Sequence, residues 1–307
     1  MFRFTWFLKL VVVVLLGTAI LGSVALAAKI PSQLKSVVTF IFVPIVDKDQ
    51  KQVLAKIGTG FFVGVSLPHK PDRMSVYLVT SKHIVFNKKL NKCRSVIVVR
   101  LNKKGGGFVN ANLRLRKTGE KKNVFFHKDS TVDVAVIPAV PNSTVVDYKA
   151  LEVKQLATKA DIAKFKIGEG TDVFFTGLFT PYIGTHKNYP IVRFGKVALL
   201  SDEKIMFGGE PMDLYLVEVT SFGGNSGSPV YFFLGADRNP GALMLGPSII
   251  KLAGVMQGNW NKKKQIVYVA EGETPASLDN MGISAVVPAY KLLEILYGEE
   301  LKAARGW

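Results

Sequence analysis

The stretch that decides the fold and the chemistry runs from Ser221 to Val230 and reads Ser-Phe-Gly-Gly-Asn-Ser-Gly-Ser-Pro-Val. Apolar runs typical of β-strands flank it, Leu214–Val217 before and Val230–Phe233 after. Glycine accepts backbone angles that other residues avoid and lets a ligand approach the main chain closely. Such a turn can present the Ser226 hydroxyl beside N–H groups that stabilise an oxyanion, at about 3–4 kcal/mol per donor. On its own, however, the string favours an ordinary Gly/Ser-rich hairpin, so the rest of the chain has to decide.

A serine hydroxyl becomes a nucleophile only when a base removes its proton and a third group holds that base. The chain offers four histidines as bases, at positions His69, His83, His127 and His186. His83 follows the apolar run Val76–Val79 and the pair Thr80-Ser81, so it lies where a strand ends. The other three have neighbours typical of turns and loops. His83 is therefore the candidate base.

Asp133 is the candidate for the orienting acid because the run Thr131–Ile137 surrounds it with apolar residues. Burying a carboxylate is costly unless it is paired, so an acid in such a run is informative. The other acids considered, Asp129, Asp147 and Asp161, lie in polar company.

Four motifs occur in the order that this chemistry would need. They are Gly58-Thr59-Gly60-Phe61-Phe62, Leu78-Val79-Thr80-Ser81-Lys82-His83, Asp133-Val134-Ala135-Val136 and Gly224-Asn225-Ser226-Gly227-Ser228-Pro229. From about Val37 to Tyr297 the chain resembles the trypsin-like (chymotrypsin-fold) serine proteases, which carry histidine, aspartate and serine in this order. The resemblance is nearest to the bacterial branch of high-temperature-requirement (Do-like) proteases, which also have asparagine before the serine. No appended PDZ domain is expected.

The resemblance implies an all-β fold with two antiparallel six-stranded β-barrels and a C-terminal helix. The first barrel would occupy residues 29–148 and contribute His83 and Asp133, and the second would occupy residues 149–307 and contribute Ser226. The backbone N–H groups of Gly224 and Ser226 would form the oxyanion hole. The expected activity is that of a serine endopeptidase acting on polypeptides through an acyl-enzyme, with no metal and no cofactor.

Specificity is predicted from positions relative to the serine motif. Thr220 would lie at the base of the primary pocket, Gly282 and Ser284 along its far wall, and Gln257 beside the substrate strand. No aspartate is expected at the base, which argues against cleavage after lysine or arginine and favours a small or medium apolar side chain. Asn225 replaces the aspartate that in trypsin receives a new N-terminal amine, so activation by that route is not expected.

The apolar periodicity predicts strands along both halves, with a helical segment between them and a helix at the end. The expected strands of the first half are Val37–Val46, Gly58–Val65, Val76–Thr80, Ser95–Leu101, Val109–Leu115, Val124–His127 and Asp133–Pro138. Those of the second are Asp172–Leu178, Ile191–Leu200, Tyr215–Thr220, Ser228–Leu234, Leu252–Gln257, Gln265–Val269 and Ile283–Val287. The expected helices are Ala150–Phe165 and Pro288–Ala304.

Residues 1–28 resemble an export signal. Arg3 and Lys9 supply positive charge, Leu10–Leu26 is almost wholly apolar, and Ala25-Leu26-Ala27 is a cleavage pattern. The alternative is an uncleaved membrane anchor, and either reading places the body outside the cytoplasm. Only one cysteine, Cys93, is present, so no internal disulfide can form.

The net charge is +17, and residues 82–128 contain fourteen Lys or Arg and one acid, Glu120. A strong positive field attracts anionic partners such as cell-surface polymers or lipid headgroups, or it serves only to keep the protein soluble. No nucleic-acid motif accompanies the charge, so no nucleic acid is expected. The alternative to an enzyme is a protease-fold binding protein with an idle triad. A lipase or esterase is disfavoured because the serine lies between strands rather than at a strand–helix elbow.

Overall fold

The computed structural model describes residues 30–67, 70–88, 90–116, 123–235, 247–263 and 278–306. The expected leader at residues 1–28, His69, Glu120 and the strand expected at Gln265–Val269 lie outside these ranges. From Ser32 onward the chain forms one compact unit. This unit contains two β-rich halves.

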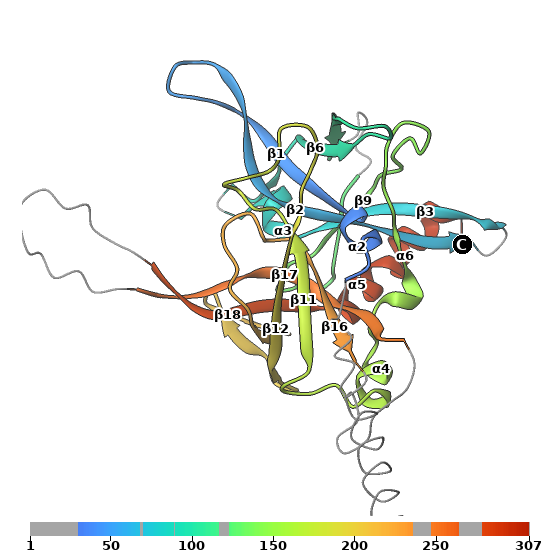
Figure 1. The fold of residues 1–307 in the computed structure, drawn as a ribbon, viewed down its shortest axis with the longest axis vertical. Coiled ribbons are helices and arrows are strands. Elements are labelled where there is room, and N and C mark those ends of the chain that lie inside the picture. The colour runs from blue at the N-terminus through green and yellow to red at the C-terminus, as the bar shows by residue number, and fades with distance from the viewer. Residues whose placement is uncertain are drawn as a thin grey trace, which may run out of the picture. The chain divides into compact units, whose positions relative to one another are not determined.

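The first half is a single sheet (Figure 1). Its strands are β1 Val38–Val46, β2 Gln52–Leu67, β3 Lys70–Thr80, β6 Val96–Asn102, β7 Phe108–Arg114, β8 Phe125–Phe126, β9 Ala135–Pro138 and β10 Leu151–Glu152. They pair in the order β7-β6-β1-β2-β3-β9-β8, and β10 joins β2 in parallel. The sequence predicted a closed six-stranded barrel for this half. Within the described residues it is instead an eight-stranded sheet, whose pairing ends at the two-residue β8.

The second half is a closed antiparallel barrel in the order β11-β12-β15-β18-β17-β16. Its strands are β11 Asp172–Gly177, β12 Ile191–Leu200, β15 Tyr215–Glu218, β16 Pro229–Leu234, β17 Ile249–Lys263 and β18 Leu278–Pro288. The apolar side chains that alternate along these strands fill the interior, with Phe175, Val217, Phe232 and Val286 among the core residues. The barrel confirms the chymotrypsin-like fold expected from the sequence.

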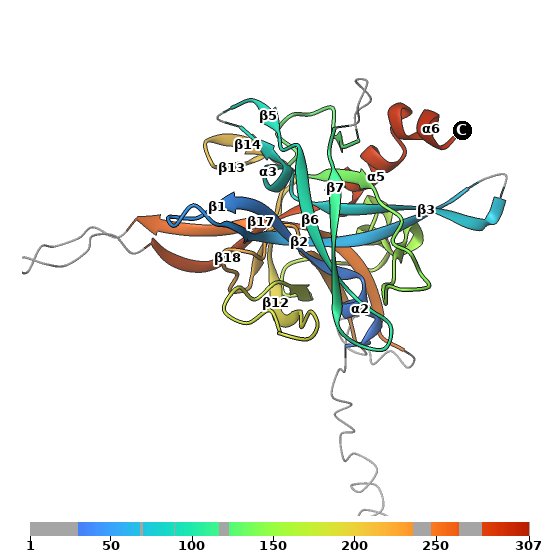
Figure 2. The same ribbon diagram turned by 90° about the horizontal axis from the view of Figure 1, so that it is seen from above.

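Each half carries a small hairpin, and the two hairpins meet where the halves adjoin. The helix α3 Lys82–Val85 follows β3 and leads to the hairpin β4 Phe86–Asn87 with β5 Lys92–Cys93. The second half carries a matching small hairpin, β13 Ile205–Phe207 with β14 Glu210–Met212. Figure 2 shows the two hairpins next to each other, where Lys88 forms an ion pair with Glu210.

The prediction of one helix over Ala150–Phe165 is wrong. Leu151 and Glu152 pair with β2, a 3-10 turn follows at Val153–Gln155, and only α4 Lys159–Lys164 is α-helical. A capping box explains the late start, because the Thr158 side chain accepts the N–H of Asp161 while Asp161 accepts that of Thr158.

The expected closing helix is divided in two. Helix α5 spans Ala289–Leu296, and Gly298 caps α6 Glu299–Arg305. Helix α5 packs against β17 and β18, and Arg305 at the end of α6 donates to the hydroxyl of Tyr77 on β3 at 3.1 Å. Among the described residues, no helix has the length and apolar character needed to cross a bilayer.

We expect Phe232→Ala to lower the free energy of unfolding by about 3–5 kcal/mol, because it opens a cavity in the barrel core. Phe232 is 0% exposed, whereas Phe194 on the same barrel is 59% exposed. Phe194→Ala is therefore the matched control, with an expected loss of about 0.5–1 kcal/mol. Denaturant unfolding measures both, and equal losses would contradict this assignment of the core.

Candidate active site

His83 and Asp133 form a two-point contact. The ring Nδ1 of His83 lies 2.7 Å from Asp133 Oδ2, and the backbone N–H of His83 donates to Asp133 Oδ1 at 2.9 Å. Asp133 is buried, while the side chain of His83 is 47% exposed. Because both carboxylate oxygens hold the same residue, the imidazole is fixed in orientation and its Nε2 is left for another partner.

Opposing influences set the pKa of His83. Desolvation by the surrounding protein is the largest and lowers the pKa, because it disfavours the charged ring, although nearly half of the side-chain surface is open to solvent. The hydrogen bond and the negative charge of Asp133 act in the opposite direction and together outweigh burial. The net result is a pKa raised above the ordinary value of 6.5.

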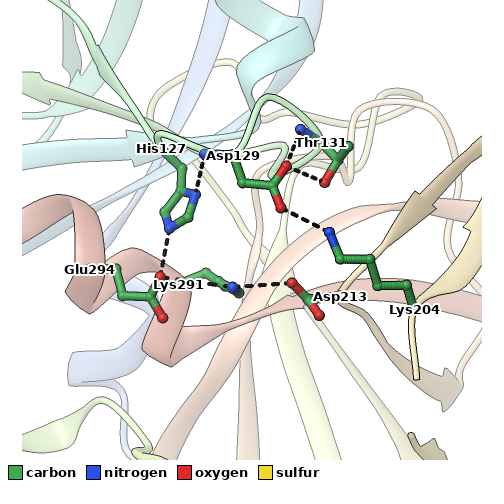
Figure 3. Close-up of polar contacts among 7 residues, drawn as sticks. All are labelled: His127, Asp129, Thr131, Lys204, Asp213, Lys291 and Glu294. Atoms are coloured by element: carbon green, nitrogen blue, oxygen red, sulfur yellow. Dashed lines mark hydrogen bonds and ion pairs between the residues drawn. The ribbon is translucent and has the colours of Figure 1, made fainter. Parts of the chain in front are cut away.

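The loop that precedes Asp133 is anchored at several points. Lys82 binds it twice, by its backbone N–H to the Asp133 carbonyl at 3.2 Å and by Nζ to the Ser130 carbonyl at 2.9 Å. Asp129 accepts hydrogen bonds from Thr131 and an ion pair from Lys204 of the second half (Figure 3). These contacts hold the pKa of Asp129 far below its usual range, with the Thr131 hydrogen bond as the largest influence.

His127 connects the same loop to helix α5 (Figure 3). Its Nδ1 accepts the backbone N–H of Asp129 at 2.9 Å, so Nε2 carries the hydrogen and faces Glu294 Oε2 at 2.6 Å. Lys291 lies between Glu294, at 3.8 Å, and Asp213, at 3.1 Å. His127 is thus a structural link, and the segment carrying Asp133 is held from both halves.

Ser226 lies in the loop that enters β16. Its hydroxyl donates to the carbonyl oxygen of Gln257 at 3.0 Å. Within the described part of the chain, no hydrogen bond joins this hydroxyl to His83. The side chain of Ser226 is partly exposed. In this structure its hydroxyl is hydrogen-bonded to strand β17, which contains Gln257.

The carbonyl oxygen of Met256 brings the histidine and serine segments together. It accepts the Ser81 hydroxyl at 2.9 Å, two residues before His83, and the Gly227 N–H at 2.7 Å, one residue after Ser226. The halves fit so closely that a Cβ on Gly227 would lie 2.1 Å from the Thr59 carbonyl oxygen. Glycine is required here both by this approach and by its φ of +83°.

The predicted oxyanion donors belong to the same loop. Gly224 has a φ of +98°, and a Cβ there would lie 2.7 Å from a Thr180 methyl carbon. The backbone N–H groups of Gly224 and Ser226 make no hydrogen bond to any described residue, so both are free to donate. Asn225 is buried and fixes the loop, with Oδ1 accepting from Phe222 at 2.8 Å and Nδ2 donating to the Leu178 carbonyl at 2.6 Å.

The predicted pocket residues divide into two groups. Ser284 and Gly282 lie on β18, and the buried hydroxyls of Ser284 and Ser221 are 2.8 Å apart. Asn280 links them, because its Nδ2 donates to the Ser221 carbonyl at 2.7 Å and its Oδ1 accepts the Gly282 N–H at 2.9 Å. Thr220, in contrast, is exposed, and its carbonyl accepts a hydrogen bond from Arg193 at 3.1 Å.

Gln257 borders the Ser226 hydroxyl directly through its backbone carbonyl. Its side chain is buried, with Nε2 3.2 Å from Met212 Sδ and with Oε1 unpaired as far as the described residues go. Sequence reasoning did not identify Ser221, Asn280 or Met256 as site residues. Met256 acts only through its backbone, which no side-chain pattern can reveal.

We expect Asp133→Asn to lower the pKa of His83 relative to the wild type, because the negative charge that favours the charged ring is removed. NMR titration of the His83 ring protons measures this pKa. Asp172→Asn is the control, since it neutralises a carboxylate on β11 that pairs with Lys196 and contacts neither the ring nor the Asp133 loop. A raised pKa that persists in Asp133→Asn would mean that another group sustains it.

No protein-family model matches the chain, and no curated protein matches it in sequence. Among solved structures, the chain is similar to the MamO protease domain from Magnetospirillum magneticum in its apo form, at 15% identity and a TM-score of 0.48. That likeness covers 85% of this chain and 96% of the other. It is too distant to support an argument about activity, so the fold is assigned from strand topology. The closed six-stranded barrel, the preceding antiparallel sheet and the C-terminal helices give this protein a chymotrypsin-like fold.

Proposed function

We propose that this protein is an exported serine endopeptidase, nearest to the Do-like branch of the trypsin-like proteases. The observation that carries the proposal is the two-point pairing of His83 with Asp133, held next to the Ser226 loop by the Met256 carbonyl. Asparagine at position 225 supports the assignment to the Do-like branch.

In the proposed mechanism, Ser226 Oγ leaves the Gln257 carbonyl and turns toward His83. Nδ1 of His83 donates to Asp133, so Nε2 carries the lone pair that accepts the serine proton. The serine oxygen forms a bond to the peptide carbonyl carbon, and the amine then leaves with the proton from Nε2. Water, deprotonated by the same Nε2, hydrolyses the acyl-enzyme and restores the serine.

The negative charge that develops on the substrate carbonyl oxygen would face the free N–H groups of Gly224 and Ser226. Such donors stabilise the tetrahedral intermediate more than the substrate, because their direction is fixed before the charge forms. The buried Asn225 side chain keeps this loop ordered without a charged partner. The roles of Gln257, Gly282 and Ser284 in binding substrate belong to the same proposal.

A second candidate is a protease-fold binding protein that recognises anionic polymers or lipid headgroups. One observation favours it, the hydrogen bond of Ser226 to Gln257 in place of one to His83. The cations of the basic region that the structure describes as exposed are Lys88, Lys92, Lys103, Lys104, Arg114, Arg116 and Lys128. They would provide a positive surface for such partners.

A fluorophosphonate probe separates the two candidates. We expect covalent labelling of the wild-type protein at Ser226, detected by intact-mass spectrometry, and no labelling of Ser226→Ala. His83→Ala should abolish labelling too, because the serine would lose its base. The control is Ser228→Ala in the same loop, which should still be labelled. A folded wild-type protein that remains unlabelled would support the binding protein instead.

The pH dependence of peptide cleavage should reflect the raised pKa of His83. Only the neutral ring can accept the serine proton, so kcat/KM should fall as the pH is lowered through that pKa. The midpoint of the acid limb is therefore expected above about 6.5, the ordinary value for histidine. A midpoint at or below that value, measured with a neutral peptide, would contradict the role of the Asp133 charge.

A further inference from the structure

Thr59 lies in the motif Gly58-Thr59-Gly60 on β2 and is 0% exposed. Its hydroxyl donates to the Gly224 carbonyl at 2.8 Å and accepts the Leu178 N–H at 2.9 Å. Its backbone N–H donates to the Ser226 carbonyl at 2.9 Å. A single residue of the first half therefore contacts both residues whose N–H groups would form the oxyanion hole.

The hydroxyl of Thr59 completes a ring of hydrogen bonds around Leu178. The Leu178 N–H donates to Thr59 Oγ1, and the Leu178 carbonyl accepts from Asn225 Nδ2 at 2.6 Å. Both residues also hold the loop of residues 221–228, here called the catalytic loop. Thr59 donates to the Gly224 carbonyl, and Asn225, within the loop, accepts the Phe222 N–H. Every member of this ring is fixed by a partner outside its own segment, so the loop has little freedom to rearrange.

The position of the Gly224 carbonyl explains why this ring matters. The peptide between Gly224 and Asn225 lies between the two peptides whose N–H groups face the oxyanion. The torsions on either side of it, ψ of Gly224 and φ of Asn225, set the direction of one donor N–H relative to the other. Glycine offers little resistance to changes in ψ, so hydrogen bonds have to hold this peptide. The Asn225 N–H donates to the Phe222 carbonyl at 2.9 Å within the loop, and the Thr59 hydroxyl binds the Gly224 carbonyl from the other half of the molecule.

Thr59 also contacts the segment that carries the base. The Thr80 hydroxyl donates to the Thr59 carbonyl at 2.7 Å, three residues before His83. All the polar atoms of Thr59 are thus engaged by the segments around His83, Gly224 and Ser226, or by Leu178.

We propose that Thr59 is a positioning residue for the oxyanion hole, acting through the Gly224 carbonyl. This role rests on the proposed serine endopeptidase function. In this role Thr59 only orients the N–H donors of the oxyanion hole. Its hydroxyl does not touch the substrate and transfers no proton. Loss of the hydroxyl would leave the Gly224 carbonyl and the Leu178 N–H buried without a partner.

The test compares Thr59→Val, which removes the hydroxyl and keeps the shape, with Thr59→Ser, which keeps the hydroxyl. Thr39→Val is the matched control, because Thr39 is also 0% exposed and donates to a backbone carbonyl, that of Arg100, at 2.7 Å. It removes an equivalent buried hydrogen bond away from the catalytic loop. Thermal unfolding of all three variants reports their stability.

Thr59→Val should lower kcat by about tenfold or more with KM changed less than about twofold, because only the transition state needs both donors. Binding of a peptide aldehyde, which forms a tetrahedral adduct with the serine, should weaken by the same factor. Thr59→Ser should retain most of the rate, and the pH midpoint of the acid limb should stay unchanged in both variants. Thr39→Val should lose stability without losing rate.

The outcomes distinguish this role from the function on which it rests. A wild-type protein that neither cleaves peptides nor reacts with the fluorophosphonate overturns the endopeptidase, and the role of Thr59 with it. A reactive wild type whose rate and aldehyde affinity are unchanged in Thr59→Val overturns the role of Thr59 alone. If Thr59→Val does not fold, Thr59→Ala removes the hydroxyl without adding a methyl group and carries the same expectation.

Discussion

The structure depends on one backbone oxygen that binds both halves of the molecule. The Met256 carbonyl accepts the Ser81 hydroxyl from the first half and the Gly227 N–H from the second. This arrangement leaves no space for a side chain at Gly227. The histidine segment and the serine loop are therefore held together by buried polar contacts whose loss would be costly on both sides.

Ion pairs and charged hydrogen bonds also fix the segment that carries Asp133 in this strongly basic chain. The charge of Asp133 is offset by contact with His83, and the preceding loop is fixed through Asp129 and His127 to cations and to helix α5. These carboxylates fix the position of the loop that carries the acid, while most of the described cations of residues 82–128 face solvent. Helix α5 lies far from Asp133 in sequence, yet it helps to position the loop that carries this acid, because Glu294 of α5 contacts His127.

Among the described residues, the local pattern of the sequence was sufficient for most of the longer strands, and it singled out His83 and Asp133, which the structure brings together. Alternating apolar residues identify buried strands, and an acid in an apolar run needs a partner. The sequence was not sufficient where tertiary contacts decide: Leu151 and Glu152 pair with β2 instead of starting a helix, and Thr220 is exposed while Ser221 is buried. Nor can a pattern show that the Ser226 hydroxyl rests on Gln257, because side-chain torsion depends on the packed neighbours.

The contacts that join the halves also have a consequence for folding kinetics. The hydrogen bond from Thr59 to Gly224 spans 165 residues of sequence, and that from Ser81 to Met256 spans 175. Contacts between such distant residues form only after long loops have closed, which makes chains of this topology slow to reach the native state. The hydrogen bonds that join the two halves are therefore expected to form late in folding, after the strands within each half have paired.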